Sequence, residues 1–368
     1  MMKINEKNER VKRAYAIHLA DAAKASEATI DQALAAICQF EEVTKGKDFA
    51  SFRIEDARRY KKFLSDQKSA STGKSLALST VRSRLMGLRT FFRWLSREPG
   101  YRSKVNYNDA DYFNQNANDE RVALAVRERP VPTLDHIRAA IKAMSGSDVL
   151  LRRARGLLAF AILTGARDSA LASLQLRHVD LSEGRIDQDA RIVKTKRRKT
   201  FSTWFIPVGD DFIVEAESWV GYLIDQLGFG PDDPLFPTTA LTQDGQKRFA
   251  PEGVLRRPWS NADPVRKIFR EAFERAGLPY FHPHSFRKTL TRWVMRQGCT
   301  DETLKAFSQN IGHEDVMTTV GSYGHVDSMR QGELVRSLRP APGMSEKSGK
   351  PDSDTIQWVL DHLKKSAV

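Results

Sequence analysis

Apolar side chains recur every three or four positions near the start of the chain, which is the spacing that one face of an α-helix needs. Ile30, Leu34 and Ile37 follow this spacing, and the segment 52–64 predicts another helix. The clearest helix spans 79–97 and carries a stripe of apolar residues on one face. The stripe consists of Val81, Leu85, Leu88, Phe92 and Leu95. The N-terminal part of the chain is therefore predicted to be entirely helical.

The rest of the chain mixes the helical period with a short region that favours strands. Helices are predicted at 133–144, 149–163, 211–227, 263–276, 284–297, 302–309 and 327–338. Two short runs rich in β-branched and aromatic residues, 191–193 and 201–207, predict strands on either side of a strongly charged loop. We expect 231–261 to be irregular and 356–363 to form a short amphipathic helix in the tail.

A change in composition divides the chain into two parts. The segment 100–118 is rich in Asn, Asp and Tyr, and Pro130 and Pro132 follow it, which is typical of a linker. We therefore predict a multidomain, mainly α protein with a small antiparallel β-sheet in its second domain. The predicted parts are a helical domain at 1–118, a linker at 119–130, a mixed domain at 131–340 and a tail at 341–368.

The charge of the chain indicates a polyanionic partner. Its 368 residues carry a net charge of +13 and a pI of about 9.7, and 40% of them are hydrophobic. Such a basic chain with enough apolar residues for two cores favours binding to nucleic acid, although basicity alone is also found in proteins with no such partner. Cys38 and Cys299 lack a metal or redox spacing, which predicts a reducing, cytoplasmic setting. Neither a signal peptide nor a membrane-spanning run is expected.

Four side chains near the C-terminus suggest chemistry at an anion. His284 and Arg287 share one helix face, His313 follows Gly312, and Tyr323 comes ten residues later. Each of them alone has an ordinary interpretation as a cap, a turn or a core tyrosine. Two imidazoles, a guanidinium and a phenol, with no neighbouring cysteine or carboxylate cluster, suit a phosphate better than a metal.

The order of these motifs resembles the C-terminal signature of the tyrosine recombinases, the phage integrase family. The matching segments are His284–Thr289, Ile311–His313 and Thr318–Thr319 before Tyr323. A second match is Thr164-Gly165-Ala166-Arg167, followed by Leu171, Leu174, Leu176 and Asp180. The chain departs from the family at Lys288, where histidine is common, and at Ala170, where an acidic residue is common. Asp168 is acidic but adjacent to the arginine, and one extra residue separates His313 from Tyr323.

The resemblance implies a role for each matching residue. The charged loop 194–199 corresponds to a hairpin that carries a catalytic lysine, which Lys196 matches best and Lys194 second best. The implied catalytic set is Arg167, Lys196, His284, Arg287, His313 and Tyr323. The tyrosine would attack the phosphodiester and form a 3′-phosphotyrosine link. Neither a nucleotide cofactor nor a metal ion is expected.

Further basic residues are predicted to contact the DNA backbone. Arg82, Arg89 and Arg93 follow one another along one face of the helix at 79–97, which Ser79 is predicted to cap. The remaining candidates are Lys194, Arg197, Arg198 and Lys199 in the charged loop. A solvated basic face and a solvated turn are the alternatives for these two groups.

The resemblance therefore predicts a site-specific DNA recombinase, an integrase of a phage or another mobile element. It implies a core-binding (SAM-like) domain at 1–118, a tyrosine recombinase catalytic domain at 131–340, and double-stranded DNA as partner. It also implies self-association into a tetramer on DNA, accessory proteins that bend DNA or set direction, and a C-terminal element passed to a neighbouring protomer. The alternatives are a type IB topoisomerase-like enzyme, a DNA-binding protein without catalysis, and a metal-dependent nuclease.

Overall fold

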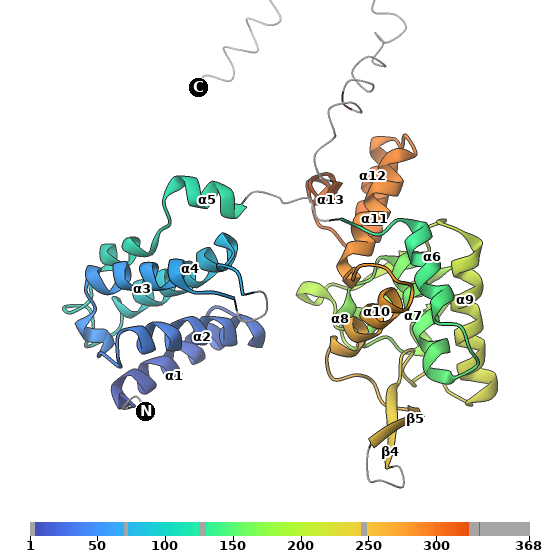
Figure 1. Cartoon of the computed structure of the whole chain (residues 1–368), viewed down its shortest axis with the longest axis horizontal. Coiled ribbons are helices and arrows are strands. Elements are labelled where there is room, and N and C mark those ends of the chain that lie inside the picture. Colours follow the sequence, from blue (N-terminus) through green and yellow to red (C-terminus); the bar gives the residue numbers. More distant parts are fainter. Residues whose placement is uncertain (1–3, 70–72, 125–129, 244–248, 324–330, 332–368) are drawn as a thin grey trace, which may run out of the picture. The chain divides into compact units, whose positions relative to one another are not determined.

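Helices dominate both parts of the chain, which confirms the mainly α architecture predicted from the sequence (Figure 1). The computed structural model describes residues 4–69, 73–124, 130–243, 249–323 and 331. The chain divides into two units, Met1–Arg127 and Glu128–Val368. The tail at 341–368 and all of the helix predicted at 327–338 except residue 331 lie outside the described residues.

The first unit is built from helices whose apolar faces meet in one core. These are α1 (Glu6–Asp21), α2 (Glu27–Val43), η1 (Phe49–Ser51), α3 (Ile54–Asp66), α4 (Leu78–Leu95), η2 (Tyr107–Phe113) and α5 (Ala117–Leu124). The stripe predicted on α4 is inside, because Leu85, Leu88, Phe92 and Leu95 are all buried. The cap of α4 was predicted wrongly, since the helix begins at Leu78 with Ala77 at the N-cap and no side-chain cap bond.

An aromatic cluster shows why 100–113 belongs to the first unit although its composition is typical of a linker. Phe113 is fully buried and stacks on Phe52 and Phe92 with ring centroids 5.6 Å apart in both pairs. Such pairs stabilise by about 0.5–1.5 kcal/mol beyond the area they bury. One aromatic anchor among many polar residues therefore decides where this segment packs. Helix α5 falls on the stretch predicted as the linker at 119–130.

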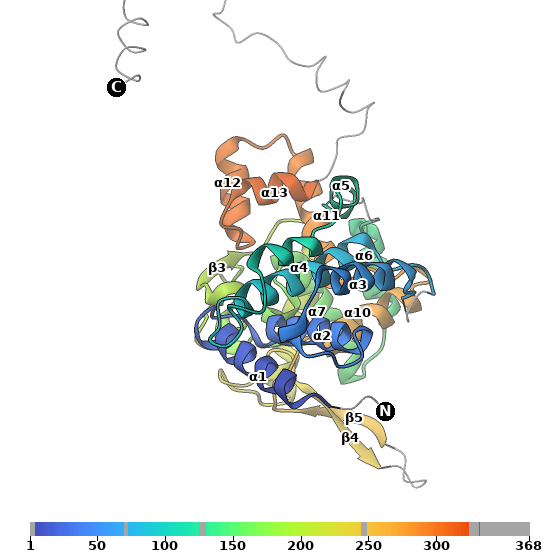
Figure 2. The ribbon, with the colours of Figure 1, turned by 90° about the vertical axis from the view of Figure 1, so that its left-hand side faces the viewer.

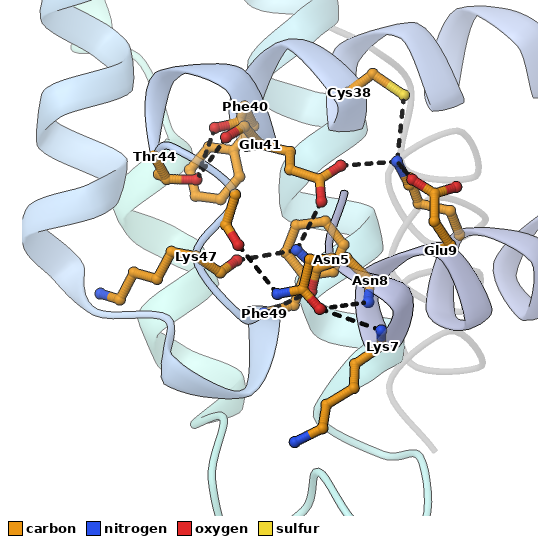
Figure 3. Close-up of polar contacts among 12 residues, drawn as sticks. Asn5, Lys7, Asn8, Glu9, Cys38, Phe40, Glu41, Thr44, Lys47 and Phe49 are labelled. Atoms are coloured by element: carbon orange, nitrogen blue, oxygen red, sulfur yellow. Dashed lines mark hydrogen bonds and ion pairs between the residues drawn. The ribbon is translucent and has the colours of Figure 1, made fainter. Parts of the chain in front are cut away.

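A buried polar network joins α1 to α2 and to the turn after α2 (Figure 3). The Asn8 side chain has no exposed surface, and it donates to Glu41 Oε1 at 2.8 Å and to the Lys47 carbonyl at 2.9 Å. Its oxygen accepts from the backbone N–H of Phe49 at 3.0 Å. The second oxygen of Glu41 accepts from Lys12 Nζ at 2.7 Å. Every polar group of Asn8 and Glu41 therefore has a partner, which is what makes their burial tolerable.

The second unit combines helices with two small antiparallel sheets. Its helices are α6 (Leu134–Ala143), α7 (Val149–Thr164), α8 (Asp168–Leu171), η3 (Leu176–His178), η4 (Lys196–Arg198), α9 (Asp210–Gly221), η5 (Tyr222–Gln226), α10 (Asp263–Arg275), α11 (Pro283–Arg296), α12 (Asp301–Asn310) and α13 (Val316–Tyr323). Its strands are β1 (Val179–Asp180), β2 (Arg185–Gln188), β3 (Phe201–Trp204), β4 (Thr238–Gln243) and β5 (Phe249–Leu255). No helix among the described residues of either unit is long and apolar enough to cross a membrane.

The strands correct two predictions. Residues 191–193 are not a strand, because Asp189 accepts from the backbone N–H and the guanidinium of Arg191 and turns the chain there. The segment 231–261 was predicted to be irregular, yet it contains the paired strands β4 and β5. In the other sheet β2 lies between β1 and β3, and β3 is an edge strand.

Helix α7 forms the centre of the second unit. Eleven of its residues are buried, and α6, α9, α10 and α11 pack around it. Gly156 permits the close approach of α9, since a Cβ at this position would lie 2.6 Å from Trp219. Helices α12 and α13 lie at one end of this unit and the β4–β5 hairpin lies at the other, as the two perpendicular views show (Figure 2).

Candidate active site

A cleft of about 490 Å³ in the second unit gathers most of the residues that the sequence singled out. They come from the end of α7, the loop between β2 and β3, the start of α11 and the loop between α12 and α13. The residues that line it are Arg167, Lys196, Arg197, Lys199, His284, Arg287, Lys288, Gly312, His313, Glu314, Asp315 and Thr318. Segments far apart in the sequence therefore bring eight basic side chains to one surface.

Arg167 reaches the cleft because α7 ends abruptly. Gly165 has a φ of +59°, in the left-handed region that glycine adopts without strain, and a Cβ there would lie 3.1 Å from Leu290. Arg167 then occupies the N-cap position of α8. Within the part of the chain that the structure describes, no hydrogen bond holds its guanidinium, and burial lowers its pKa.

Arg287 is held far more firmly than Arg167. Its side chain is only 4% exposed, and its two terminal nitrogens donate to the carbonyls of Gly165 and Ile311, the latter at 2.7 Å. These carbonyls belong to the C-cap residues of α7 and α12, so one guanidinium ties three helices together. Burial, and to a lesser extent the charge of Arg167, lower its pKa to about 9. Both arginines stay cationic at neutral pH.

His284 and His313 share this positive environment. Burial is the main cause that lowers the pKa of each imidazole to about 4, and the charges of Arg287 and Arg167 act in the same direction. The charge of Lys288 adds to the effect on His284, and that of Lys196 adds to the effect on His313. Both rings are therefore neutral at pH 7, and a bound anion would raise their pKa.

The ring of His313 is oriented by a chain of hydroxyl groups. Its Nδ1 lies 2.8 Å from Thr319 Oγ1, and this hydroxyl donates to Ser308 Oγ at 2.9 Å. Since the threonine proton is used toward Ser308, the imidazole donates from Nδ1 and its Nε2 carries the lone pair. Thr319 is fully buried. The sequence pattern gave the position of this threonine but no reason to assign it a role.

The two candidate lysines in the loop between β2 and β3 have different surroundings. Lys196 lines the cleft, whereas Lys194 Nζ donates to the Ser260 carbonyl at 2.7 Å. The backbone of Lys194 is also fixed, because its N–H donates to Ser173 Oγ and its carbonyl accepts from Ser169 Oγ. This places Lys196 two residues beyond an anchored point.

The other cations of this loop differ in their surroundings. Arg197 and Lys199 line the cleft, and Arg197 pairs with Glu314 on the opposite wall. Arg198 is not among the lining residues. Arg197 and Arg198 have φ values of +58° and +51°, a conformation that costs about 1–2 kcal/mol per residue outside glycine. The bend that they make turns the loop back toward β3.

The three arginines of α4 that were predicted to contact DNA all have acidic partners in the first unit. Arg89 Nε lies 3.0 Å from Asp111 Oδ1, and Arg93 pairs with the same oxygen. Arg82 lies 3.3 Å from Glu120. All three guanidinium groups keep exposed surface, so these ion pairs leave donors free for a phosphate, and the DNA contact stays a prediction.

The departure at position 170 has a structural counterpart. Ala170 is buried, and the neighbouring Asp168 accepts from Arg266 of α10 at 2.8–2.9 Å. The acidic residue next to Arg167 therefore holds α8 to α10 and does not support the Arg167 guanidinium.

Tyr323 is the last residue of α13, a helix that packs against α11 and α12. Its side chain lies outside the described part of the structure. The five other residues of the predicted catalytic set, Arg167, Lys196, His284, Arg287 and His313, all line the cleft.

The sequence of this chain matches one known family over most of the second unit. The sequence model of the phage integrase family matches residues 133–330. Among characterised relatives, the chain is 25% identical over 261 residues to the tyrosine recombinase XerC of Alcanivorax borkumensis, which covers 71% of this chain and 73% of the relative.

Solved structures share the fold at low sequence identity. A Tn1549 transposon integrase in complex with transposon right end DNA has a TM-score of 0.57 and 16% identity, covering 89% of this chain and 99% of that one. A lambda integrase tetramer bound to a Holliday junction has a TM-score of 0.54 and 14% identity, covering 94% of this chain and 80% of that one.

Proposed function

This chain belongs to the phage integrase family of tyrosine recombinases, enzymes that break and rejoin DNA, and we propose that it is the site-specific integrase of a phage or another mobile element. Its substrate is double-stranded DNA. The six predicted catalytic residues act on one phosphodiester at a time, and the reaction needs neither a nucleotide cofactor nor a metal ion.

The reaction is a transfer of a phosphoryl group to a phenol. The Tyr323 oxygen bonds to phosphorus while the bond from phosphorus to the 5′-oxygen breaks. The phenolic proton passes to His284, and Lys196 gives a proton to the leaving 5′-oxygen. The products are a 3′-phosphotyrosine link and a free 5′-hydroxyl, so attack by a 5′-hydroxyl reverses the steps and rejoins the strand.

The observation that carries this proposal is the convergence of two arginines on one cleft, neither of which has a carboxylate partner among the described residues. Arg167 and Arg287 face the same cleft, each lowers the pKa of both imidazoles, and the charge of Arg167 also lowers the pKa of Arg287. Preorganised cations of this kind have no energetic reason to converge unless an anion lies between them. The charge that develops on a phosphodiester during transfer is what two planar guanidinium groups bind best.

The surroundings of the two lysines support the assignment of the general acid to Lys196. A side chain that protonates the leaving oxygen must reach the phosphate, and Lys196 lines the cleft that holds both arginines. Lys194 instead has a carbonyl partner at Ser260. Arg197 and Lys199 contact the neighbouring DNA backbone in this proposal, as do Arg82, Arg89 and Arg93 of the first unit.

The source and the assembly are proposed by analogy with the similar proteins. The solved relatives include a transposon integrase on transposon DNA and a tetramer on a Holliday junction, which supports a mobile-element origin and a tetramer on DNA. The first unit would act as the core-binding domain on the DNA. The involvement of accessory proteins stays a prediction from the resemblance.

The test is a covalent-trapping experiment. The protein is incubated in chelator with a nicked suicide substrate that carries its own recombination site. We expect a protein–DNA adduct that is lost in Tyr323→Phe. An adduct that persists in this variant would move the nucleophile to another residue, and cleavage that stops in chelator would favour a metal-dependent nuclease.

A further inference from the structure

The outer edge of β3 is occupied by a single side chain from α12. Asn310, the last residue of α12, accepts from the Trp204 backbone N–H through Oδ1 at 2.7 Å. Its Nδ2 donates to the Trp204 carbonyl at 2.9 Å. The amide thus pairs with both backbone groups of one residue on an edge strand, as a neighbouring strand would.

The backbone of Asn310 joins the same strand. Its carbonyl accepts from Thr203 Oγ1 at 2.8 Å, and this hydroxyl in turn accepts from Gln188 Nε2 of β2 at 2.8 Å. Thr203 is fully buried and Gln188 is 3% exposed. Four hydrogen bonds, two of which involve the buried Thr203, therefore connect β2, β3 and the end of α12 into one joint, and such networks hold a single geometry.

This joint lies between two walls of the cleft. Toward the N-terminus, β3 leads back into the loop that carries Lys196. Toward the C-terminus, α12 leads through Gly312 to His313. The walls also meet at the Arg197–Glu314 ion pair and at Gly312, where φ is +72° and a Cβ would lie 2.6 Å from the Phe201 ring. The place of Lys196 relative to the phosphate-binding groups therefore depends on how α12 holds β3.

We propose that Asn310 is a positioning residue for Lys196, which rests on the proposed function of that lysine as the general acid. A proton donor has to lie within hydrogen-bond reach of the leaving oxygen. A displacement of about 1 Å in a catalytic group can cost about 100-fold in rate. Asn310 is not among the residues that line the cleft, so its contribution passes through β3.

A misplaced general acid can be distinguished from a general loss of stability by changing the leaving group. Replacing the 5′-bridging oxygen of the scissile phosphate by sulfur gives a thiolate leaving group, which departs without a proton. A variant that misplaces only the proton donor recovers its rate on this substrate. A variant that distorts the phosphate-binding arginines or unfolds the unit stays slow on both.

The experiment measures single-turnover cleavage of the two suicide substrates by the full-length protein. We expect Asn310→Ala to cleave the oxygen substrate about 10- to 100-fold more slowly than the wild type and to regain most of its rate on the sulfur substrate. Lys196→Ala should behave in the same way, and Arg287→Ala should be slow on both. Gln309→Ala is the matched control, because this exposed neighbour on α12 should cleave both substrates like the wild type.

Asn310→Asp keeps the acceptor for the Trp204 N–H and loses the donor to its carbonyl, so it serves if the alanine variant does not fold. A folded variant that cleaves the oxygen substrate at the wild-type rate would overturn the proposal. So would a folded variant that is slow on both substrates while Lys196→Ala is rescued by sulfur. If Lys196→Ala is not rescued, the general-acid role of the lysine fails, and the role of Asn310 falls with it. The covalent-trapping experiment with Tyr323→Phe tests the recombinase chemistry independently of Lys196 and Asn310.

Discussion

Replacing either arginine of the cleft should slow cleavage to a similar extent, but only the loss of Arg287 should lower stability markedly. Arg287 donates to two carbonyls and is buried, whereas Arg167 makes no hydrogen bond among the described residues. We compare Arg287→Ala with Arg167→Ala. Because each removes one cation that would bind the phosphoryl oxygens, each should slow cleavage by about 10²–10³-fold.

The stability cost of Arg287→Ala follows from its two bonds. A hydrogen bond to a charged group contributes about 1.5–3 kcal/mol net, and the carbonyls of Gly165 and Ile311 would lose their partner inside the protein. We therefore expect the free energy of unfolding to fall by about 3–6 kcal/mol. For a unit of this size that lowers the melting temperature by about 6–24 °C, since 1 kcal/mol corresponds to about 2–4 °C.

Arg167→Ala removes no hydrogen bond that the structure describes, and it removes the repulsion that lowers the pKa of Arg287. Its free energy of unfolding should stay within about 1 kcal/mol of the wild-type value. Differential scanning calorimetry of the full chain measures both variants. Arg296→Ala is the control, because this exposed arginine in the last turn of α11 loses the same charge with no change expected in either quantity.

Two results would refute this reasoning. An Arg287→Ala protein as stable as the wild type would mean that the two carbonyl bonds do not hold α7, α11 and α12 together. An Arg167→Ala protein that loses several kcal/mol would give that residue a structural role that its surroundings do not show.

Three further outcomes are expected. Acidification should destabilise the protein without DNA as the pH falls from about 6.5 to about 4. His284 and His313 have a pKa of about 4 when folded, so the unfolded chain takes up protons first. Thermal melts should show a flatter pH profile in the two His→Gln variants. Gly312→Ala should cost about 1–3 kcal/mol in urea denaturation, and Phe201→Leu in the same chain should restore part of it, because the added Cβ meets that ring at 2.6 Å. Arg93→Ala should lower the log–log salt slope of DNA binding by about one in fluorescence anisotropy, and an unchanged slope would leave this arginine as an internal ion-pair partner.

The helices and the family were predictable because their signals are local. The apolar stripe of α4 and the continuous apolar run of α7 need only their own sequence to be recognised. The same holds for the motifs that carry Arg167, His284, Arg287 and His313, whose order along the chain is enough to indicate the family that the comparison confirms.

The β4–β5 hairpin and the partners of the site residues were not predictable, for two physical reasons. Leu241 and Phe249 are 59% and 69% exposed, so this hairpin lacks the apolar alternation that a half-buried strand shows. The contacts of the site join residues far apart in the sequence. Asn310 meets Trp204 106 positions away, and Arg287 meets Gly165 122 positions away, distances over which no periodicity carries information.

The choice of partners for Arg287 explains how the cleft keeps its charge. A carboxylate would hold a buried guanidinium as firmly, but it would cancel the charge and compete with the phosphate for the same donors. The structure uses the carbonyls of Gly165 and Ile311 instead, at the ends of α7 and α12, where a helix leaves its last carbonyls without an intrahelical partner. These neutral groups orient Arg287 without cancelling its positive charge, which stays, together with that of Arg167, in the cleft where we propose that the phosphodiester binds.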